Sequence, residues 1–525
     1  MTVAAPSAAI DGLRLRGRRL VQRGEAALLI RWRELSAAPK LMLVLAALTV
    51  GISTLIRLFV GQGDPLWLDE AWTGAIVGQS SWAETLRQTY LDVNAPLYYL
   101  FMHAWQGIFG LSDFALRAPS ILAGIATPAA LMFTRTKGLE TSDRIVWAAL
   151  TGLWIDGLWY SADARCYVFL VLFCALQTSA FANLLAAPNT RRAAVWAAWT
   201  SLSILTHYHA LFLGAVQGLM FLALAPRQAL ASWKAAFVFL PMAAWMGVHA
   251  TRVIQFARPD VAWYDLLRPQ DLVWLIQFIF PNLLLLLIPG AGLGLILWRA
   301  LRREPQQDLA SAALWWAGLS ALIGVSLVIG LGFLRPSFTL RYLTPYAPGL
   351  FLLATLLVRS LNPAWSTPSL SASLAARLAV VVLALDGAAS WAMAAYGHTS
   401  RPFTYEAASL DMLKAHPDQI VFTWDHPAAQ VEAPSQYDVA GGFFFRRAGS
   451  KAVITPVLVQ PGEDPNLKLL AAAKGPHSAI LWLYDMGVHG TQARRFPPKI
   501  ETLDPRFHCR QYGRGSIGVL GCVQP

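Results

Sequence analysis

Eleven segments of this chain are apolar over lengths close to the roughly 20 residues that an α-helix needs to cross a bilayer. As a helix, such a segment satisfies its own backbone hydrogen bonds inside a lipid phase that offers no other partners. The segments are Leu41–Val60, Phe114–Thr134, Ile145–Tyr160, Tyr167–Ala187, Ala193–Thr206, Ala210–Ala225, Ala235–Ala250, Leu272–Trp298, Leu309–Leu334, Tyr342–Val358 and Leu374–Tyr396. They predict a polytopic α-helical membrane protein with about eleven spans.

The composition agrees with this prediction and excludes other classes of protein. Of the 525 residues, 56% are hydrophobic and only 14% are charged, whereas soluble domains carry about 25% charged residues. This hydrophobicity excludes a disordered or fibrous chain, and four cysteines are too few for a disulfide scaffold. The net charge of +12 alone could suggest a nucleic-acid partner, so the positions of the charges have to decide.

The basic residues indicate how the segments cross the membrane. Pro96–Gly110 is apolar and aromatic but only 15 residues long, so it is either a short span or a helix in the interface, where Tyr and Trp concentrate. If it does not cross and the N-terminus is cytoplasmic, the inner segments hold 20 Lys and Arg and the outer segments hold 8. The positive-inside rule therefore favours an interfacial helix on the outer surface. The charge excess then reports topology and gives no support to a nucleic-acid partner.

This orientation divides the chain into three parts. Residues 1–40 form a basic cytoplasmic segment, in which Leu13–Leu35 is either an amphipathic helix on an anionic membrane face or an unstructured positive tail. Residues 41–396 form the transmembrane domain, with a long outer loop at Gly61–Asp113. Residues 397–525 form an α/β domain outside the cytoplasm.

The last of these parts alternates strand-like and helical segments, which favours an α/β layer arrangement. The strand-like runs are Gln419–Trp424, Ala452–Val459 and Ala479–Tyr484, and the helical runs are Tyr405–Ala415 and Asn466–Ala473. The closing sequence FHCRQYGRGSIGVLGC has a glycine-rich centre between apolar ends, which is typical of a β-hairpin. Cys509 and Cys522 would lie on its two strands, and an oxidising compartment would allow them to pair.

Polar residues gather on the predicted outer side. In a membrane protein, polar side chains gathered on one face commonly mark a functional site. They fall in five clusters along the chain. These are Asp69 and Glu70 in LWLDEAW with Asp92 and Asn94 in LDVNAPLYY, Asp163, Arg165 and Tyr167 in YSADARCY, His207 and His209 in THYHA, His249 and Arg252 in VHATR, and Arg335, Arg341 and Tyr342 in LRPSFTLRYLTPY.

Carboxylates that face several cations across an interface suit a reaction on an anionic lipid. An acidic side chain can deprotonate an acceptor hydroxyl, and arginine binds phosphate oxygens in bidentate fashion. Each cluster alone also has a simpler interpretation. Asp69 and Glu70 could be an acidic pair at a helix N-terminus, and Asp163 with Arg165 could be a surface ion pair. Arg252 and Arg341 could extend to lipid headgroups, so the conjunction of the clusters carries the functional interpretation.

The order of these motifs resembles the GT-C glycosyltransferases, in the bacterial branch with protein mannosyltransferase-like and aminoarabinose transferase-like enzymes. The acidic pair in the first outer loop matches, as does Asn94-Ala95-Pro96-Leu97-Tyr98-Tyr99 at the start of the interfacial helix. Three further elements match: Ala115-Leu116-Arg117-Ala118-Pro119-Ser120, Ala164-Arg165-Cys166-Tyr167, and the late Arg341-Tyr342-Leu343. The likeness covers roughly Leu66–Val358, and enzymes of this kind carry an outer C-terminal domain.

The resemblance implies an inverting hexosyl- or pentosyltransferase of the bacterial cytoplasmic membrane. The donor would be a polyprenyl-phosphate sugar, and the acceptor a lipid, glycan or protein on the outer face. Asp69 would be the base that activates the acceptor, with Glu70 supporting it. Arg165 would orient the first loop or the donor, and Arg341 would contact the lipid phosphate.

Further residues complete the site that the resemblance implies. His249 and Arg252 are assigned to the phosphate, since the loop beyond that span commonly contributes there, and Tyr98 and Tyr342 belong to the substrate-binding set. Asn94 stands where many relatives have histidine, which argues against an ionisable role. Asp163 stands where relatives have glutamate, which keeps the charge and shortens the reach.

The cofactor prediction is mostly negative. The chain has no P-loop or dinucleotide-binding glycine signature, and a lipid-linked sugar needs no nucleotide on the outside. No metal site is assigned, although some relatives use a divalent cation such as Mg²⁺ or Mn²⁺. Asp69, Glu70 and Asp163 could supply oxygen ligands for one.

Two other functions remain open from the sequence. A transporter or flippase for a lipid-linked or small anionic substrate is the main alternative, although the chain shows no clear internal repeat. A non-catalytic membrane scaffold is the second, and it would leave the acidic loop unexplained. The identities of the sugar and the acceptor are not encoded in any motif of this sequence.

Overall fold

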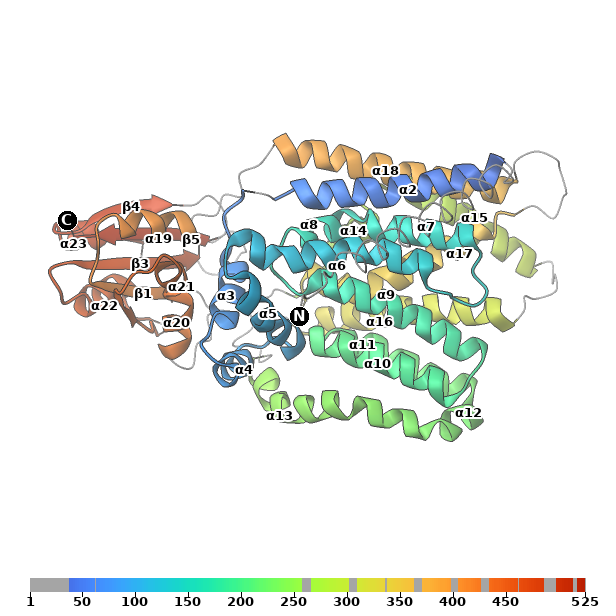
Figure 1. Ribbon diagram of the computed structural model, residues 1–525, viewed down its shortest axis with the longest axis horizontal. Coiled ribbons are helices and arrows are strands. Elements are labelled where there is room, and N and C mark those ends of the chain that lie inside the picture. Colours follow the sequence, from blue (N-terminus) through green and yellow to red (C-terminus); the bar gives the residue numbers. More distant parts are fainter. Residues whose placement is uncertain are drawn as a thin grey trace, which may run out of the picture.

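The computed structural model describes residues 37–61, 63–256, 266–301, 309–335, 338–362, 371–397, 405–425, 434–460, 462–485, 497–512 and 517–524. Most of these residues form a bundle of long helices, and the C-terminal part forms a separate sheet at one end of that bundle (Figure 1). The predicted amphipathic segment Leu13–Leu35 lies outside the described residues.

The bundle is built from helices that coincide with the predicted apolar segments. They are α2 (Ala37–Phe59), α6 (Asp113–Phe133), α7 (Thr141–Gly152), α8 (Ile155–Ser161), α9 (Tyr167–Ala186), α10 (Thr190–Thr206), α11 (Ala210–Leu224), α13 (Leu240–Phe256), α14 (Leu272–Ile279), α15 (Leu284–Leu301), α16 (Leu309–Leu334), α17 (Ala347–Arg359) and α18 (Ala372–Gly397). Short helical turns join some of them: α12 (Pro226–Ala231), η1 (Trp233–Phe239), η2 (Pro269–Asp271) and η3 (Leu340–Tyr346).

Seven helices in the described chain are long and apolar enough to cross a membrane. They correspond to seven of the eleven predicted segments. The other four predicted segments lie on shorter or interrupted helices, namely α7 with α8, α10, α11, and η3 with α17. A membrane protein is therefore confirmed by helix length and composition, and the count of eleven stays a prediction.

The interruptions follow from local chemistry. Pro281 lies in the break between α14 and α15, where a residue without an N–H cannot continue the helical hydrogen-bond ladder. The break between α7 and α8 is held by tertiary contacts, because the indole of Trp154 donates to the carbonyl of Phe278 at 2.7 Å. An apolar cavity of about 570 Å³ opens beside these breaks and is lined by Ile155, Pro281 and Leu284 among others.

Three short helices stand at the end of the bundle next to the sheet (Figure 1). They are α3 (Leu68–Val77), α4 (Trp82–Leu91) and α5 (Pro96–Phe109). Helix α5 begins with proline at its first position, where the missing N–H is not needed. It has 14 residues, is not among the seven candidate spans, and packs against α3, α4 and α10.

The C-terminal part is an α/β unit, as predicted. Its elements are α19 (Tyr405–Leu413), β1 (Gln419–Asp425), α20 (Pro434–Gly441), α21 (Phe443–Arg447), β2 (Val453–Pro456), α22 (Pro465–Ala472), β3 (Ser478–Asp485), α23 (Ile500–Leu503), β4 (His508–Tyr512) and β5 (Ile517–Val523). The strand order is β2-β1-β3-β5-β4. Strands β2, β1 and β3 are parallel, and β5 and β4 are antiparallel to their neighbours.

The predicted hairpin and its disulfide are both present. Cys509 on β4 faces Cys522 on β5 in register, and the two form a disulfide. The prediction is confirmed. The disulfide depends on this register, because a one-residue shift of either strand would turn one of the sulfur atoms to the opposite face of the sheet.

The sheet unit and the short loop helices share one hydrophobic core. Its buried members include Leu68 and Ala75 from α3 and Tyr99 from α5, together with Phe422 and Phe443 from the C-terminal part. The opposite face of the sheet has a second cluster under α22 and α23. The C-terminal unit is thus packed directly onto the first loop rather than tethered beside it.

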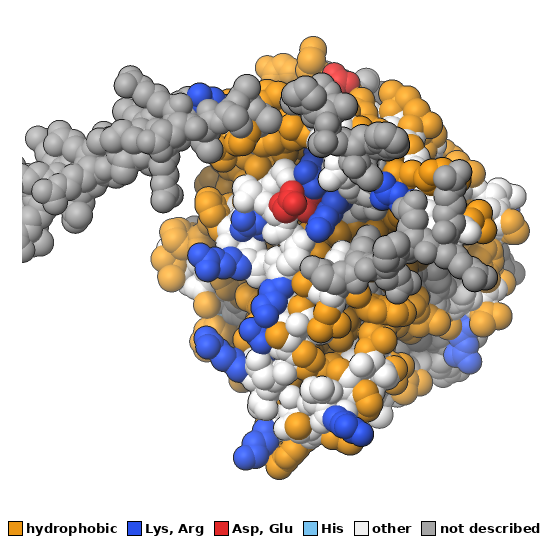
Figure 2. Space-filling model, turned by 90° about the vertical axis from the view of Figure 1, so that its right-hand side faces the viewer, with side chains coloured by type: hydrophobic (Ala, Val, Ile, Leu, Met, Phe, Trp, Pro, Cys, Tyr) orange, Lys and Arg blue, Asp and Glu red, His pale blue; other side chains and the backbone are white. Residues whose placement is uncertain are grey.

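The opposite end of the bundle is basic. Figure 2 shows Lys and Arg side chains spread across that end, with few acidic ones among them. Exposed cations lie on the connection after α6, in the first turn of α10, and on α12 and η1: Arg135, Lys137, Arg191, Arg227 and Lys234.

Candidate active site

Asp69 lies between two arginines that come from distant parts of the chain. It occupies the first turn of α3, and its Oδ2 is 3.0 Å from Nη1 of Arg341 on η3 and 3.8 Å from Nη2 of Arg165. The Asp69 side chain keeps 26% of its surface exposed, and the Arg341 side chain keeps 19%. A carboxylate and a guanidinium are therefore both reachable from outside the protein at the sheet end of the bundle.

Arg165 is buried and ties the first loop together. Its Nη1 lies within 3.4 Å of three acceptors, namely the backbone carbonyl of Asp69, Oγ1 of Thr73 and the hydroxyl of Tyr99. The guanidinium thereby joins α3 to α5 just beneath the Asp69 carboxylate. The planar fork of donors lets Nη1 make these contacts while Nη2 lies 3.8 Å from the Asp69 carboxylate.

Asn94 and Asp92 extend this network along the loop before α5. The hydroxyl of Tyr99 donates to Oδ2 of Asp92 at 2.9 Å, and the amide of Asn94 donates to the same oxygen at 2.8 Å. Burial, followed by the nearby Asp92 carboxylate, raises the pKa of Tyr99 well above its ordinary value. Tyr99 therefore acts as a neutral donor, and Asn94 serves as a hydrogen-bonding residue without a charge.

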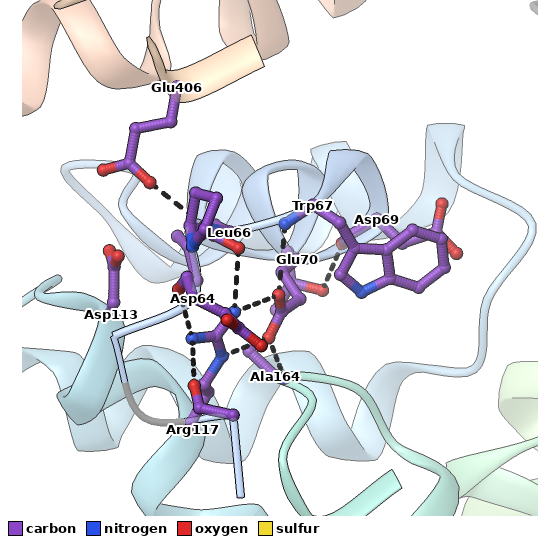
Figure 3. A network of polar contacts seen from close by, with 12 residues as sticks. Asp64, Leu66, Trp67, Asp69, Glu70, Asp113, Arg117, Ala164 and Glu406 are labelled. Atoms are coloured by element: carbon purple, nitrogen blue, oxygen red, sulfur yellow. Dashed lines mark hydrogen bonds and ion pairs between the residues drawn. The ribbon is translucent and has the colours of Figure 1, made fainter. Parts of the chain in front are cut away.

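Glu70 is sealed below α3 and does not face the same space as Asp69. Its two oxygens accept four hydrogen bonds, from Nε (2.7 Å) and Nη2 (2.6 Å) of Arg117, the backbone N–H of Ala164 (2.8 Å) and that of Trp67 (3.1 Å). In Figure 3 the Glu70 carboxylate points toward Arg117 and Ala164, whereas Asp69 lies beside Trp67, away from that pair. The geometry gives Glu70 the supporting part of the predicted pair.

Arg117 fixes the beginning of the same loop. Besides Glu70, it donates to the carbonyls of Gly61 (3.2 Å), Asp64 (2.7 Å) and Pro65 (3.1 Å). Asp163 is buried, and its charge acts on the Arg117 guanidinium. The structure thus places Asp163 within electrostatic range of the Arg117–Glu70 pair.

His249 and Arg252 from α13 contact backbone carbonyls at the end of α4. Nε2 of His249 lies 2.9 Å from the carbonyl oxygen of Tyr90, and Arg252 donates to the carbonyl of Leu91 at 3.0 and 3.2 Å. The ring of His249 also bonds the hydroxyl of Tyr208. His249 and Arg252 therefore anchor the loop that carries Asp92 and Asn94.

Aromatic rings wall the side of the site around Arg341. The guanidinium carbon of Arg341 lies 5.9 Å from the ring centre of Tyr167, and Tyr342 stacks on His209 with ring centres 3.9 Å apart. Burial lowers the pKa of His209 to about 4. Burial, then His209 and the two arginines, lower the pKa of His207 well below its usual range. Both imidazoles are therefore neutral at ordinary pH.

Tyr98, the remaining predicted residue, has a packing environment. Its ring lies edge-on to Tyr99 and Phe169 at 5.9 and 5.6 Å, and its side chain is buried. Adjacent residues on α5 point to different sides, and the hydroxyl of Tyr99 is the one that contacts Arg165 and Asp92.

The C-terminal unit contacts α3, the helix that carries Asp69, and the residues just before it. Glu406 accepts a hydrogen bond from the backbone N–H of Leu66 at 3.1 Å, and Arg447 pairs with both Glu406 and Asp113. The ring of Phe443 comes so close to Gly74 on α3 that an added Cβ would lie 2.4 Å from it. The position of Asp69 therefore depends on the C-terminal unit as well as on the bundle.

The carboxylates do not fit a shared divalent cation. Among the residues that the structure describes, no group of three or more His, Cys, Asp or Glu side chains is gathered closely enough to hold a metal. Asp69 is engaged by Arg341 and Glu70 by Arg117, and each pair already balances the negative charge that a cation would need.

The sequence did not reveal several residues that position the site. Thr73, Glu406 and Arg447 carry no motif that would distinguish them from surface polar residues. Arg117 and Tyr99 were visible within the matching motifs, but their contacts with Glu70 and Asp92 were not. Only a three-dimensional register of these segments identifies such partners.

Comparison with known proteins gives similarity at the level of fold. No protein-family model matches the chain, and no curated protein matches it. A crystal structure of ArnT from Cupriavidus metallidurans in the apo state is 12% identical, with a TM-score of 0.51, and the match covers 93% of this chain and 98% of that one. ArnT bound to undecaprenyl phosphate is 14% identical with a TM-score of 0.49, at the same coverage. Such coverage includes both bundle and sheet, so the predicted GT-C-type fold is confirmed.

Proposed function

We propose that this chain is an inverting glycosyltransferase that moves a sugar from a polyprenyl-phosphate donor to an acceptor at the sheet end of the bundle. The observation that carries the proposal is the position of Asp69, a partly exposed carboxylate 3.0 Å from Arg341 and 3.8 Å from Arg165. A base and a phosphate-binding cation side by side are the two groups that this reaction needs.

The reaction is a single displacement. Asp69 takes the proton of the acceptor hydroxyl while the oxygen of that hydroxyl bonds to C1 of the sugar. The bond from C1 to the phosphate oxygen breaks on the opposite face. The lipid phosphate leaves with the bonding electrons, and Arg341 stabilises its charge. Because Arg341 is paired with Asp69 before substrate binds, arrival of the phosphate draws the cation away and frees the carboxylate to act as a base.

The donor class rests on chemistry and on a likeness of fold. The fold is that of ArnT, a protein that has been crystallised with undecaprenyl phosphate. In this chain, the Arg341 guanidinium lies at the sheet end of a bundle of apolar helices. This arrangement suits an anionic headgroup on a long apolar tail. The transferred group is a hexose or pentose, and the acceptor is a lipid, glycan or protein.

The sheet end is proposed to face the outside of a bacterial cytoplasmic membrane. The basic residues that face the viewer in Figure 2 lie at the other end, and the positive-inside rule assigns that end to the cytoplasm. The Cys509–Cys522 disulfide supports an oxidising compartment for the C-terminal unit. The N-terminus would then be cytoplasmic.

The direct test uses purified protein in lipid nanodiscs with a panel of polyprenyl-phosphate sugars and acceptors. Wild type is expected to form a glycosylated acceptor, and Asp69→Asn is expected to bind polyprenyl phosphate and lose transfer. Glu84→Gln is the matched control, because Glu84 is an acidic residue of the same loop that accepts hydrogen bonds from Arg87 and Gln88 on its own helix. Transfer by Asp69→Asn at the wild-type rate would contradict the mechanism. Movement of lipid or sugar across sealed vesicles without any covalent product would favour a transporter.

A further inference from the structure

Arg57 is a buried cation inside a candidate membrane span, and the proposed reaction does not use it. It lies near the end of α2, within the span Pro39–Phe59, and only 2% of its surface is exposed. A buried arginine in an apolar bundle is costly, so its presence there points to a role that an aliphatic residue could not perform.

The partners of Arg57 are neutral groups on three helices. Its Nε donates to Oγ of Ser161 at 2.9 Å, and its Nη1 donates to the backbone carbonyl of Gly152 at 2.9 Å. Nη1 also bonds the carbonyl (3.2 Å) and the hydroxyl of Ser53, one turn earlier on α2. Within the described part of the chain, no carboxylate lies within ion-pair distance of Arg57.

These contacts connect α2 to the C-terminal ends of both α7 and α8. Gly152 is the last residue of α7, and Ser161 is the last residue of α8. Carbonyls at the end of a helix lack intrahelical donors, and the Arg57 guanidinium supplies one to Gly152. A single side chain of α2 therefore bonds the last residue of α7 and the last residue of α8, which lie on either side of residues 153–160.

Helix α8 leads directly into the segment that bears Arg165. Arg165 lies four positions after Ser161, and one turn after Arg57 the backbone of Gly61 lies against Ala162. A Cβ built on Gly61 would lie 2.8 Å from the Cβ of Ala162. The end of α2 thus helps to fix the position of the segment that carries Arg165. The hydrogen bonds of Arg165 to Asp69, Thr73 and Tyr99 depend on that position.

We propose that Arg57 is a positioning residue for the transfer reaction, acting through α8 to place the Arg165 guanidinium beneath Asp69. The inference rests on the proposed function, since Arg165 matters through its hold on the helix that carries the base. A charged, five-donor fork is needed because the site requires hydrogen bonds in several directions from one side chain.

Gly124 on α6 offers a way to displace the guanidinium without removing it. A Cβ at position 124 would lie 2.3 Å from Nε of Arg57 and 2.4 Å from Oγ of Ser161. Gly124→Ala therefore forces this contact apart while every polar group stays in the chain. Gly51→Ala is the matched control on α2, because a Cβ there meets nothing within 4 Å.

The test measures kcat, the donor KM and polyprenyl-phosphate binding for Arg57→Lys, Gly124→Ala and Gly51→Ala. Misplacement of a positioning group by about 1 Å can lower turnover by roughly 100-fold. We therefore expect Arg57→Lys and Gly124→Ala to lower kcat by about 10- to 100-fold with donor KM and binding nearly unchanged, whereas Gly51→Ala matches wild type.

A double variant separates positioning from general damage to the fold. If Arg57 acts through Arg165, Arg57→Lys combined with Arg165→Lys lowers kcat no further than Arg165→Lys alone. Additive losses, or wild-type kcat in both Arg57→Lys and Gly124→Ala, would overturn the inference. If Arg57→Lys does not fold, Gly124→Ala and its double variant decide the same question. Failure of wild type to transfer sugar at all would instead refute the proposed function.

Discussion

The structure assigns different work to the two adjacent carboxylates of the first loop, and substitution of each by its amide separates them. Glu70→Gln leaves a group of the same shape, but one of the two oxygens becomes an NH₂ that cannot accept hydrogen bonds. Each Glu70 oxygen accepts one bond from Arg117 and one from a backbone N–H. The variant therefore strands two buried donors and leaves the Arg117 charge without its counter-ion.

The expected cost follows from burial. The Glu70 side chain is fully buried and that of Arg117 is 4% exposed, and breaking a buried ion pair by removing one partner costs about 3–5 kcal/mol. With an unfolding entropy of about 2.1 cal/mol/K per residue over 525 residues, this loss corresponds to a fall in Tm of roughly 3–5 °C. Asp69→Asn, at a partly exposed ion pair, should cost only about 0–1 kcal/mol.

The assay compares thermal unfolding and sugar transfer for both variants in the same detergent, with transfer measured well below either Tm. Glu70→Gln should show the lower Tm and keep a measurable fraction of transfer, whereas Asp69→Asn should keep the wild-type Tm and lose transfer. A Glu70→Gln protein with wild-type Tm and no transfer would refute this reasoning, because it would show that Glu70 acts on substrate. Loss of stability in Asp69→Asn alone would refute it equally.

Three further changes test other parts of the structure. Arg341→Lys removes the bidentate fork and should weaken polyprenyl-phosphate binding by about 1.5–3 kcal/mol, or roughly 10- to 150-fold in Kd, measured by titration. Cys509→Ser opens the disulfide to Cys522, which closes a loop with a sequence separation of 13, and should cost about 3 kcal/mol of stability, measured by thermal unfolding. Gly74→Ala drives a Cβ into the ring of Phe443 and should destabilise the contact by about 1–3 kcal/mol while lowering kcat.

Matched controls accompany these variants. Gly107→Ala on α5 adds the same methyl group where nothing lies within 4 Å, so it should leave kcat unchanged. Reduction of wild type by a thiol should reproduce the Tm of Cys509→Ser if the disulfide is the source of the loss. Wild-type phosphate affinity in Arg341→Lys would show that another cation binds the donor.

Much of the fold could be predicted because membrane helices are encoded locally. Every predicted apolar segment lies on a helix or on a pair of interrupted helices, since burial of about 20 apolar residues in lipid is decided within one window of sequence. The strands around Phe422 and Leu481 were likewise visible from β-rich apolar runs, and a glycine-rich turn between cysteines indicated the hairpin.

The candidate site could be predicted only in part. Asp69, Arg165 and Arg341 were predicted as site residues, and they lie together. Their segments were predicted to lie at the same end of the bundle, which brings such segments close to one another. His249 and Arg252 were assigned to the donor phosphate, yet the hydrogen bonds described for them include the carbonyls of Tyr90 and Leu91. A cation near a membrane surface serves a phosphate and a carbonyl equally well, so its type and spacing do not distinguish the two.

The sequence by itself determined which segments form apolar helices and where the strands of the sheet form, because hydrophobicity and backbone propensity act over short stretches. Only the tertiary structure decided that Asp69 faces the open side while Glu70 faces Arg117. Neighbouring residues on a helix point about 100° apart. Whether each meets a buried guanidinium or solvent depends on segments that lie 47 to 272 positions away in the chain, and no local rule contains that information.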